Sequence, residues 1–336
     1  MTSKERLRRA LNHEAVDWLP TQINYTLALG AQMAQFYAVS PADLTAVLGN
    51  HMIRVDIDVP PRFSRDGKIR IDGWGVGFAV EEEGYFAALN PLREDPDLDA
   101  YPWPDFHAPG LFDKARETIN REAGQHFIVP NLGFALFERA WTLRGLDTFM
   151  LDMAADPGFV EALLDRIVEI QLALIHGFIA LGVDGGYFGD DYGAQKSMLF
   201  SPRMWRRFIK PRLARLFAPF RAAGLPVIMH SDGQIQAILP DLIEIGLGAL
   251  NPVQPEVLDH IWLRETFGDQ LAYYGGISTQ TVLPHGSPQD VRKAVDACRR
   301  HLAPEGTGLV LAPSHRMMTD IPMENIDALL QAFRAG

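Results

Sequence analysis

The segment PVIMHSDG, residues 226–233, decides the fold. The apolar run Val227–Met229 leads directly into the polar triplet HSD and then a glycine. A short apolar run that ends in titratable residues is typical of a buried parallel strand whose carboxyl end carries a site. Five other segments share this design: VPNLG (129–133), GYFGDDYG (186–193), LNPVQPE (250–256), YYGGIST (273–279) and VLAPSH (310–315). Such strand ends form the active site of a (β/α)8 barrel.

Expected strands and helices alternate along the chain. The expected strands are 18–24, 51–59, 127–132, 185–189, 227–230, 249–253, 271–275 and 308–311. Apolar periodicity and Pro or Ser starts predict helices at 4–12, 27–37, 41–49, 112–123, 157–182, 202–224, 235–245, 259–267, 288–302 and 323–334. No glycine-rich phosphate turn follows the first strand, which disfavours a doubly wound sheet. The sequence therefore predicts an α/β fold, a (β/α)8 TIM barrel with added N-terminal helices.

Residues 62–89 interrupt this alternation. They contain Asp-Gly twice, alternating apolar residues and several glycines, which predicts an inserted β-hairpin. Residues 91–110 are rich in Pro and Asp and are expected to form a surface connection, too short for a domain linker. We therefore expect one barrel domain over residues 1–336, with the N-terminal additions and the hairpin within 1–110.

Composition limits the class of protein. The chain has 336 residues and a formal net charge of −11, which argues against general nucleic-acid binding. Its one cysteine, Cys298, excludes a disulfide within the chain, and no apolar run approaches the about 20 residues of a membrane span. The charged N-terminus does not resemble a signal peptide, so we expect a cytoplasmic protein. We also expect a small-molecule substrate. The arginine-rich helix after Pro202 is expected to present a solvated outer face.

Two histidines and a carboxylate form the first candidate site. His230 and Asp232 lie two residues apart at one strand end, and His315 lies at the end of the last strand. This residue set suits zinc or ferrous iron. The alternatives are that His230 is a core histidine bonded to a carbonyl and that Asp232 belongs to a turn.

Acidic residues at strand ends form a second candidate group. Asp190 and Asp191 are adjacent, and neighbouring residues of an extended segment point to opposite sides, so only one should face the cleft. Two close carboxylates separate their pKa values and suit acid/base chemistry, although an Asx turn is the alternative. Glu256 is a third candidate. The candidate substrate-binding residues, each of which could instead be a turn or packing residue, are Asp56, Asn131, Tyr192, Gln254, Gly276 and Ser278.

Linked motifs over nearly the whole chain resemble the uroporphyrinogen decarboxylase superfamily. They are SKERLRRALNHEAVDWLP (3–20), GDDYGAQKSMLFSPRMWRRFIKP (189–211), HSDG (230–233), ALNPVQPE (249–256), YYGGISTQTVLPHGSPQDV (273–291) and LAPSHRM (311–317). The resemblance implies a (β/α)8 barrel with its cleft at the carboxyl ends of the strands.

The resemblance implies two styles of chemistry. Uroporphyrinogen decarboxylases carry an arginine-rich N-terminal motif and a catalytic aspartate, whose place Asp56 or Asp58 could take. Here the loop TLALGAQMAQFY (26–37) has no arginine, so we expect no useful uroporphyrinogen turnover. The corrinoid-linked methyltransferases hold zinc with His-x-Cys and a later Cys. This chain matches the histidine at His230 but has Asp232 and His315 in place of the cysteines. Such nitrogen and oxygen ligands should favour an oxygen-bearing substrate over a thiol.

The resulting hypothesis is a metal-dependent methyltransferase or demethylase that works with a corrinoid protein. His230, Asp232 and His315 would bind the metal, expected to be zinc, and the acidic candidates would act in proton transfer or positioning. Two alternatives remain: a metal-independent decarboxylase of a small or tetrapyrrole acid, and a catalytically silent barrel that binds a corrinoid or tetrapyrrole. Metal content separates the first hypothesis from the other two.

Overall fold

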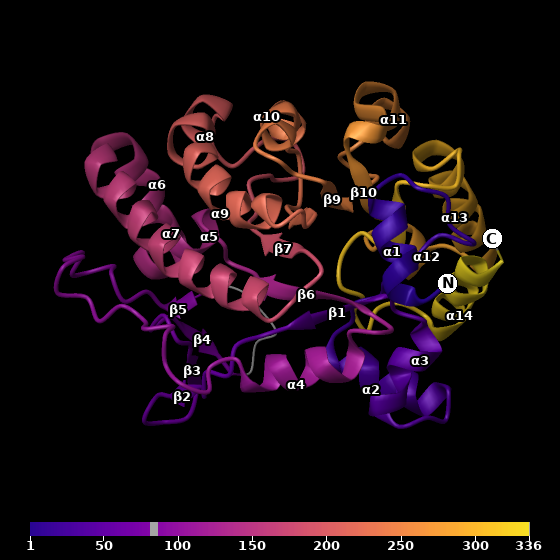
Figure 1. Cartoon of the computed structure of the whole chain (residues 1–336), viewed down its shortest axis with the longest axis horizontal. Coiled ribbons are helices and arrows are strands. Elements are labelled where there is room, and N and C mark those ends of the chain that lie inside the picture. The colour runs from indigo at the N-terminus through magenta and orange to yellow at the C-terminus, as the bar shows by residue number, and fades with distance from the viewer. Residues whose placement is uncertain (81–86, 336) are drawn as a thin grey trace.

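A curled parallel sheet forms the centre of the molecule (Figure 1). The computed structural model describes residues 1–80 and 87–335. The seven parallel strands pair in the order β1-β6-β7-β8-β9-β10-β11. Their bounds are Met52–Val55 (β1), Phe127–Leu132 (β6), Gly186–Gly189 (β7), Val227–His230 (β8), Ala249–Val253 (β9), Ala272–Ile277 (β10) and Leu309–Pro313 (β11). The predicted α/β barrel is confirmed.

The eighth position of the barrel is occupied by residues 20–26 without a regular strand. Thr21 pairs with Leu311 through a single parallel bridge, and on its other side the Thr21 carbonyl accepts a hydrogen bond of 3.1 Å from the His51 amide. The predicted strand 18–24 is therefore wrong as a strand. The physical reason is that the Asn50 side chain takes both backbone groups of Ile23, at 2.8 and 2.9 Å, so these cannot pair in a ladder.

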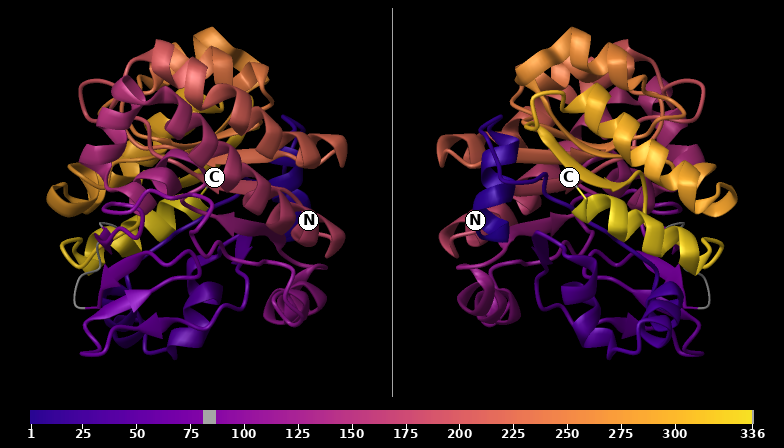
Figure 2. Two further views of the ribbon diagram at one scale, coloured as in Figure 1. Left: turned by 90° about the vertical axis from the view of Figure 1, so that its left-hand side faces the viewer. Right: turned by 90° about the vertical axis from the view of Figure 1, so that its right-hand side faces the viewer.

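Helices surround the barrel (Figures 1 and 2), and α1 packs against strand residues of the smaller, inner cluster. Those of the first part are α1 (Ser3–Leu11), α2 (Leu27–Phe36), α3 (Leu44–Leu48), α4 (Asp113–Glu122), α5 (Phe137–Arg144), α6 (Leu146–Ala155) and α7 (Pro157–Ala180). The later ones are α8 (Pro202–Phe208), α9 (Lys210–Ala222), α10 (Leu239–Glu244), α11 (His260–Phe267), α12 (Val282–His285), α13 (Pro288–Leu302) and α14 (Met323–Arg334). Among the described residues, no helix is both long and apolar enough to cross a bilayer.

The predicted helix 202–224 is two helices. α8 and α9 meet at Ile209, and Pro211 lies in the first turn of α9. Proline has no N–H to continue the preceding helix, which explains the break. Both helices carry basic side chains that bind acidic partners on neighbouring helices: Arg206 binds Asp241, and Arg212 binds Asp165 with two hydrogen bonds. These ion pairs hold the helical layer together on its outer side.

A second, antiparallel sheet stands where the sequence predicts a hairpin. Its strands pair in the order β2-β3-β4-β5, with bounds Arg62–Phe63, Ile69–Ile71, Gly77–Ala79 and Ala87–Leu89. The structure has four short strands here instead of the two strands of one hairpin, and neighbouring strands pair over only two or three residues. Residues 81–86 of the predicted hairpin lie outside the described residues. The β3–β4 connection reaches the carboxyl ends of the barrel strands and contributes to the site described below.

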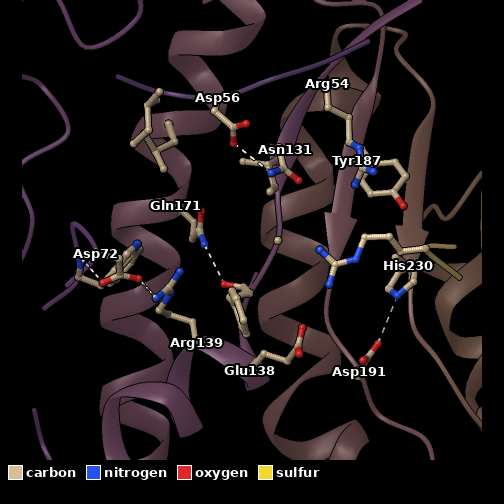
Figure 3. A pocket seen from close by; sticks show the side chains of 18 of the residues that line it. Arg54, Asp56, Asp72, Asn131, Glu138, Arg139, Gln171, Tyr187, Asp191 and His230 are labelled. Atoms are coloured by element: carbon tan, nitrogen blue, oxygen red, sulfur yellow. Dashed lines mark hydrogen bonds and ion pairs between the residues drawn. The ribbon is translucent and has the colours of Figure 1, made fainter. Parts of the chain in front are cut away.

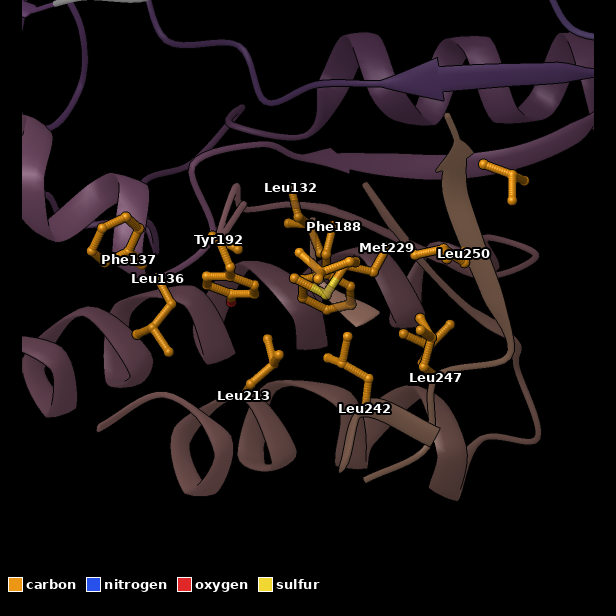
Figure 4. Packing of buried hydrophobic residues seen from close by; sticks show 14 of the residues in the cluster. Leu132, Leu136, Phe137, Phe188, Tyr192, Leu213, Met229, Leu242, Leu247 and Leu250 are labelled. Carbon is orange, nitrogen blue, oxygen red and sulfur yellow. The ribbon is translucent and has the colours of Figure 1, made fainter. Parts of the chain in front are cut away.

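Successive residues of the strands belong alternately to two different hydrophobic clusters. Phe188 and Met229 point outward and pack with Leu213 and Leu242 from the covering helices (Figure 4). Their neighbours Tyr187 and Ile228 belong instead to a smaller cluster that also includes residues of α1. This alternation is the two-residue period of a strand, with one face towards the covering helices and the other towards the interior of the barrel.

Candidate functional site

A cavity of about 980 Å³ opens at the carboxyl ends of the strands. Its lining comes from the ends of six strands, β1, β6, β7, β8, β9 and β11, from α5 and α7, and from the β3–β4 connection. Figure 3 shows its labelled residues arranged around the space: Arg54, Asp56, Asp72, Asn131, Glu138, Arg139, Gln171, Tyr187, Asp191 and His230. The position agrees with the site that the sequence predicts for a barrel.

The three predicted metal ligands lie together at one side of this cavity. One ligand atom from each of His230, Asp232 and His315 lies within 4.8 Å of the other two. The Oδ2 atom of Asp232 is 3.7 Å from the Nε2 atom of His230 and 3.5 Å from that of His315. The two histidines line the large cavity, so three protein ligands would leave room for a substrate ligand, as catalytic zinc or non-haem iron requires. These three residues, named the metal-ligand group here, could hold a metal ion.

Asn251 orients His230. The Nδ2 atom of Asn251 donates to the Tyr274 carbonyl at 3.2 Å, so its Oδ1 atom is the acceptor. That oxygen lies 2.7 Å from Nδ1 of His230 and accepts another hydrogen bond, also 2.7 Å, from the Tyr187 hydroxyl. His230 therefore carries a proton on Nδ1 and directs Nε2 towards Asp232. This is the outer-shell support that histidine ligands of metals usually have.

Charge supports the same reading of the group. Burial alone would lower the pKa of His230, but the carboxylates of Asp232 and Asp191 raise it well above its usual value. Burial raises the pKa of Asp232, yet its two histidine neighbours lower it overall. Burial also lowers the pKa of His315. Asp232 is thus held as a carboxylate between the two histidine rings, and a cation bound there would displace the Nε2 proton that the raised pKa keeps on His230.

Asp190 and Asp191 point to opposite sides, as predicted for adjacent residues. Asp190 is fully buried and accepts hydrogen bonds from the backbone N–H groups of Phe137 and Glu138, at 2.8 and 2.7 Å. Burial raises the pKa of Asp190 to about 6. Asp191 lines the cavity and accepts a hydrogen bond of 2.9 Å from the Asp232 amide. Asp190 therefore supports the start of α5, and Asp191 borders the metal-ligand group.

Glu138 is a cavity residue that sequence reasoning missed. Its side chain lies between Arg139 and Asp191 in Figure 3. Burial raises the pKa of Glu138 well above its usual value, and Asp191 and Asp190 raise it further. Helix α5 is buried on most of its sides, so its sequence lacks the 3.6-residue alternation of apolar and polar residues that would have predicted a helix. The available signal was a Glu-Arg pair inside the apolar run FALFERAWTL.

Asp56 and Asn131 meet at the cavity wall. Nδ2 of Asn131 donates to Oδ1 of Asp56 at 3.0 Å, and both residues line the cavity. Burial raises the pKa of Asp56, while the bond from Asn131 opposes that shift. Arg54, which sequence reasoning also missed, lies two residues earlier on β1 with its guanidinium 4.9 Å from the Tyr187 ring. Alternation along the strand directs Arg54 and Asp56 to the same face.

Glu256, Ser278 and Gln254 lie apart from the large cavity. Glu256 is exposed and accepts a hydrogen bond from the Ser278 hydroxyl. Ser278 is buried and also accepts from the Thr281 amide at 2.9 Å, so it organises the turn after β10. Gln254 lines a smaller polar cavity of about 320 Å³, to which Asp232 and His315 also contribute. The metal-ligand group thus borders both spaces.

Tyr192 and Gly276 have packing roles in the structure. Tyr192 is fully buried, packs against Phe137 and Trp205, and donates to Oδ2 of Asp190 at 2.7 Å. Gly276 has a φ of +101°, and a Cβ atom there would lie 2.3 Å from Sγ of Cys298. Neither residue is among those that line the cavities.

Comparison with known proteins identifies the family. The model of the family described as "Uroporphyrinogen decarboxylase (URO-D)" matches residues 2–336. The chain belongs to the uroporphyrinogen decarboxylase family. It is 26% identical to a uroporphyrinogen decarboxylase of Thermus thermophilus over 76% of this chain and 73% of that one. It is 21% identical to that of Aliivibrio salmonicida over 98% and 96% of the two chains. A match of 28% identity to the Geobacillus kaustophilus protein covers 47% of each chain.

A solved structure has the same fold. The "methyltransferase from Methanosarcina mazei" superposes with a TM-score of 0.74 over 99% of this chain and 98% of that one, at 19% identity. The matching family is named for a decarboxylase, and the solved structure of the same fold is named a methyltransferase. The cavity at the strand ends of this family member is therefore its candidate active site.

Proposed function

We propose that the protein is a metal-dependent methyltransferase or demethylase that passes a methyl group to or from a corrinoid protein. The observation that carries the proposal is the convergence of His230, Asp232 and His315 within 4.8 Å, with both histidines in the wall of the large cavity. A metal site there borders space for a substrate, whereas a purely structural metal site is closed by protein ligands on all sides. The methyltransferase named among the structures of the same fold is consistent with this reaction class.

The donor set fits zinc. When bound, zinc would supply a Lewis acid that polarises an oxygen of the substrate. His230, Asp232 and His315 would hold it, and Asn251 would keep Nε2 of His230 directed at it. The absence of thiolate ligands makes the site harder than a cysteine site, so we propose an oxygen-bearing methyl compound as substrate.

Asp191 and Glu138 would serve proton transfer. Both are cavity carboxyl groups whose pKa values burial raises, and Asp191 borders the ligand group directly. A carboxyl group with a raised pKa can give a proton to a leaving oxygen at neutral pH. Two such groups on one wall allow one to donate while the other positions the substrate.

Metal content and methyl transfer test the proposal. The purified protein should contain about one zinc per chain, and His230→Ala combined with Asp232→Asn should remove it. The zinc-loaded enzyme should methylate free cob(I)alamin from a small methyl ether, which absorbance spectroscopy detects. Arg207→Gln, on the outer face of α8, is the matched control. A chain without zinc affinity, or equal transfer by the double variant, would overturn the proposal.

Decarboxylation is the second candidate. It is supported by the names of the curated relatives and by Asp56, which lies in the cavity beside Arg54. The loop at 26–37 still has no arginine, so we expect no efficient formation of coproporphyrinogen from uroporphyrinogen. A decarboxylation assay that showed efficient turnover, retained in the zinc-free double variant, would favour the decarboxylase.

A further inference from the structure

The wall of the cavity opposite the metal-ligand group carries a buried arginine. Arg139 is 6% exposed and lines the cavity from α5. Figure 3 shows Arg139 and Asp72 on one side of the pocket and His230 and Asp191 on the other, with Glu138 between them. A substrate that fills the cavity would therefore reach from the metal-ligand group to this arginine.

Asp72 fixes the position of Arg139 but uses only part of its hydrogen-bonding capacity. Its Nη1 atom donates to Oδ2 of Asp72 at 2.8 Å, while Oδ1 of Asp72 is occupied by the amides of Trp74 and Val76. The Nε–H group of Arg139 is buried and has no hydrogen-bond partner within the described part of the chain. A buried donor without an acceptor costs free energy, and this one belongs to a side chain that lines the cavity, so the contact with Asp72 alone leaves part of the guanidinium uncompensated.

Aromatic rings surround the same guanidinium. Its Cζ atom lies 4.9 Å from the centre of the Trp74 ring and 5.3 Å from that of Phe134. Both rings line the cavity, and Phe106 and Trp141 extend the aromatic wall. A flat ring can stack in this space while a group on its edge meets the arginine.

The charge of the cavity also suits an anion. Four arginines, Arg54, Arg70, Arg139 and Arg316, line it together with four carboxyl groups. The whole chain, by contrast, has a formal net charge of −11. The four arginines thus match the four carboxyl groups of the cavity, so a small anion meets no excess of negative charge there.

A structural tie between α5 and the β3–β4 connection is the simpler explanation of the Arg139–Asp72 pair. That explanation accounts for one nitrogen of the guanidinium only. It does not account for the unpartnered Nε–H or for the aromatic wall of the open cavity. We infer that Arg139, oriented by Asp72 and flanked by Trp74 and Phe134, anchors a carboxylate carried on an aromatic ring. This inference rests on the proposed function, since it names the class of substrate that the cavity presents to the metal site.

Calorimetric titration with benzoate tests the anchor without any turnover. Wild-type protein should bind benzoate saturably, and benzamide and cyclohexanecarboxylate more weakly, because the first lacks the charge and the second the flat ring. Arg139→Gln should weaken benzoate binding at least about tenfold, the effect of losing a buried charged hydrogen bond. Arg139→Lys keeps the charge beside Asp72 and should retain part of the affinity. Arg207→Gln, an outer-face arginine, should bind like wild type.

The titration is repeated on zinc-loaded and chelator-treated protein. Benzoate binding that needs Arg139 in both forms supports the anchor even if the protein proves to have no zinc and the proposed reaction fails. The absence of saturable binding to wild type, or equal affinity of the Arg139→Gln and Arg207→Gln proteins, would overturn it. If Arg139→Gln does not fold, the comparison of benzoate with benzamide and the Arg139→Lys protein decides: equal affinities throughout contradict the anchor.

Discussion

The side-chain amide of Asn251 fixes the tautomer and the ring orientation of His230. It accepts from Nδ1 of His230 and from the Tyr187 hydroxyl, and its own Nδ2 is committed to a carbonyl. These three bonds leave one tautomer and one ring orientation for His230. Because the residues come from β7, β8 and β9, the arrangement depends on neighbouring strands being in register.

Asn251→Leu should weaken zinc binding by roughly 10–100-fold, the usual effect of removing an outer-shell partner of a ligand. The lost acceptor frees His230 to rotate and leaves the Tyr187 hydroxyl buried without its partner. Competition with a chromophoric chelator measures the affinity. Asn131→Leu is the control, since Asn131 pairs with Asp56 away from the ligand group. Equal zinc affinity of both variants and wild type would contradict the role of Asn251.

Asp190→Asn should reduce stability rather than chemistry. Asp190 accepts two backbone N–H groups at the start of α5 and the Tyr192 hydroxyl. An amide has one acceptor oxygen in place of two, so a buried donor loses its partner, which costs about 1–3 kcal/mol. Urea unfolding monitored by circular dichroism measures the change. An unaltered free energy of unfolding would show that α5 does not depend on this carboxylate.

Asp191→Asn should reduce turnover and leave the fold intact. Asp191 faces the cavity and borders His230, with 3.9 Å between its Oδ1 and Nε2 of the histidine. Replacement by an amide keeps the shape but removes the proton-transferring group, which typically lowers turnover by about 10²–10⁴-fold. Steady-state kinetics on the true substrate, with the unfolding midpoint as the control, tests this. Full activity would assign Asp191 to the turn alone.

At the scale of elements, two loops approach each other through glycines. The loops after β7 and β8 touch at Gly193 and Gly233, where an added Cβ would lie 2.6 Å and 2.5 Å from backbone atoms of the other loop. Gly233 also has a φ of +79°, which favours glycine. This contact places Asp232 next to Asp191 and so brings the ends of two strands into one site.

Gly193→Ala should separate these loops and weaken zinc binding. The added methyl group meets backbone at 2.6 Å on two sides, so the loop after β8, which carries Asp232, has to shift. Gly124→Ala is the matched control, because nothing lies within 4 Å of a Cβ there. Zinc affinity measured by chelator competition should fall in the first variant alone. Equal affinities would mean that the loop contact does not position Asp232.

For the whole molecule, His51 links the N-terminal helix to the closure of the barrel. Nη1 of Arg6 lies 3.1 Å from Nε2 of His51, and a guanidinium can only donate, so the imidazole accepts and is neutral. The backbone of His51 bonds to Thr21 in the eighth position of the barrel. Burial, and then the charge of Arg6, lowers the pKa of His51 to about 4.

Stability should therefore fall as the pH decreases from about 6.5 to about 4. In this window His51 binds a proton in the unfolded chain but stays neutral in the folded protein. The free energy of unfolding therefore falls, by about 3 kcal/mol at pH 4. Urea unfolding at stepped pH values measures the slope. His51→Gln, which retains an acceptor for Arg6, should flatten that part of the curve. A variant curve parallel to that of wild type would assign the acid sensitivity to other groups.

Local patterns in the sequence determined much of the barrel. Apolar runs bounded by Pro, Gly and titratable residues predicted β6 and β8 with their structural bounds, and the 3.6-residue period with a Ser-Pro start predicted α13. Both signals lie within about ten residues, so no tertiary contact is needed to read them. The same locality identified His230, Asp232 and His315 as residues at strand ends.

Only the tertiary structure decided how those ends are used. It assigned Asp190 to the interior and Asp191 to the cavity, because α5 presents its N–H groups to one of them only. It joined Arg139 to Asp72 across 67 residues, a contact that no local period contains. It also left residues 20–26 without regular strand pairing. The Asn50 side chain bonds the backbone N–H and C=O groups of Ile23, which a neighbouring strand would otherwise pair with. Strand ends are local properties of the chain, whereas the partners of a side chain depend on which distant segments the barrel brings together.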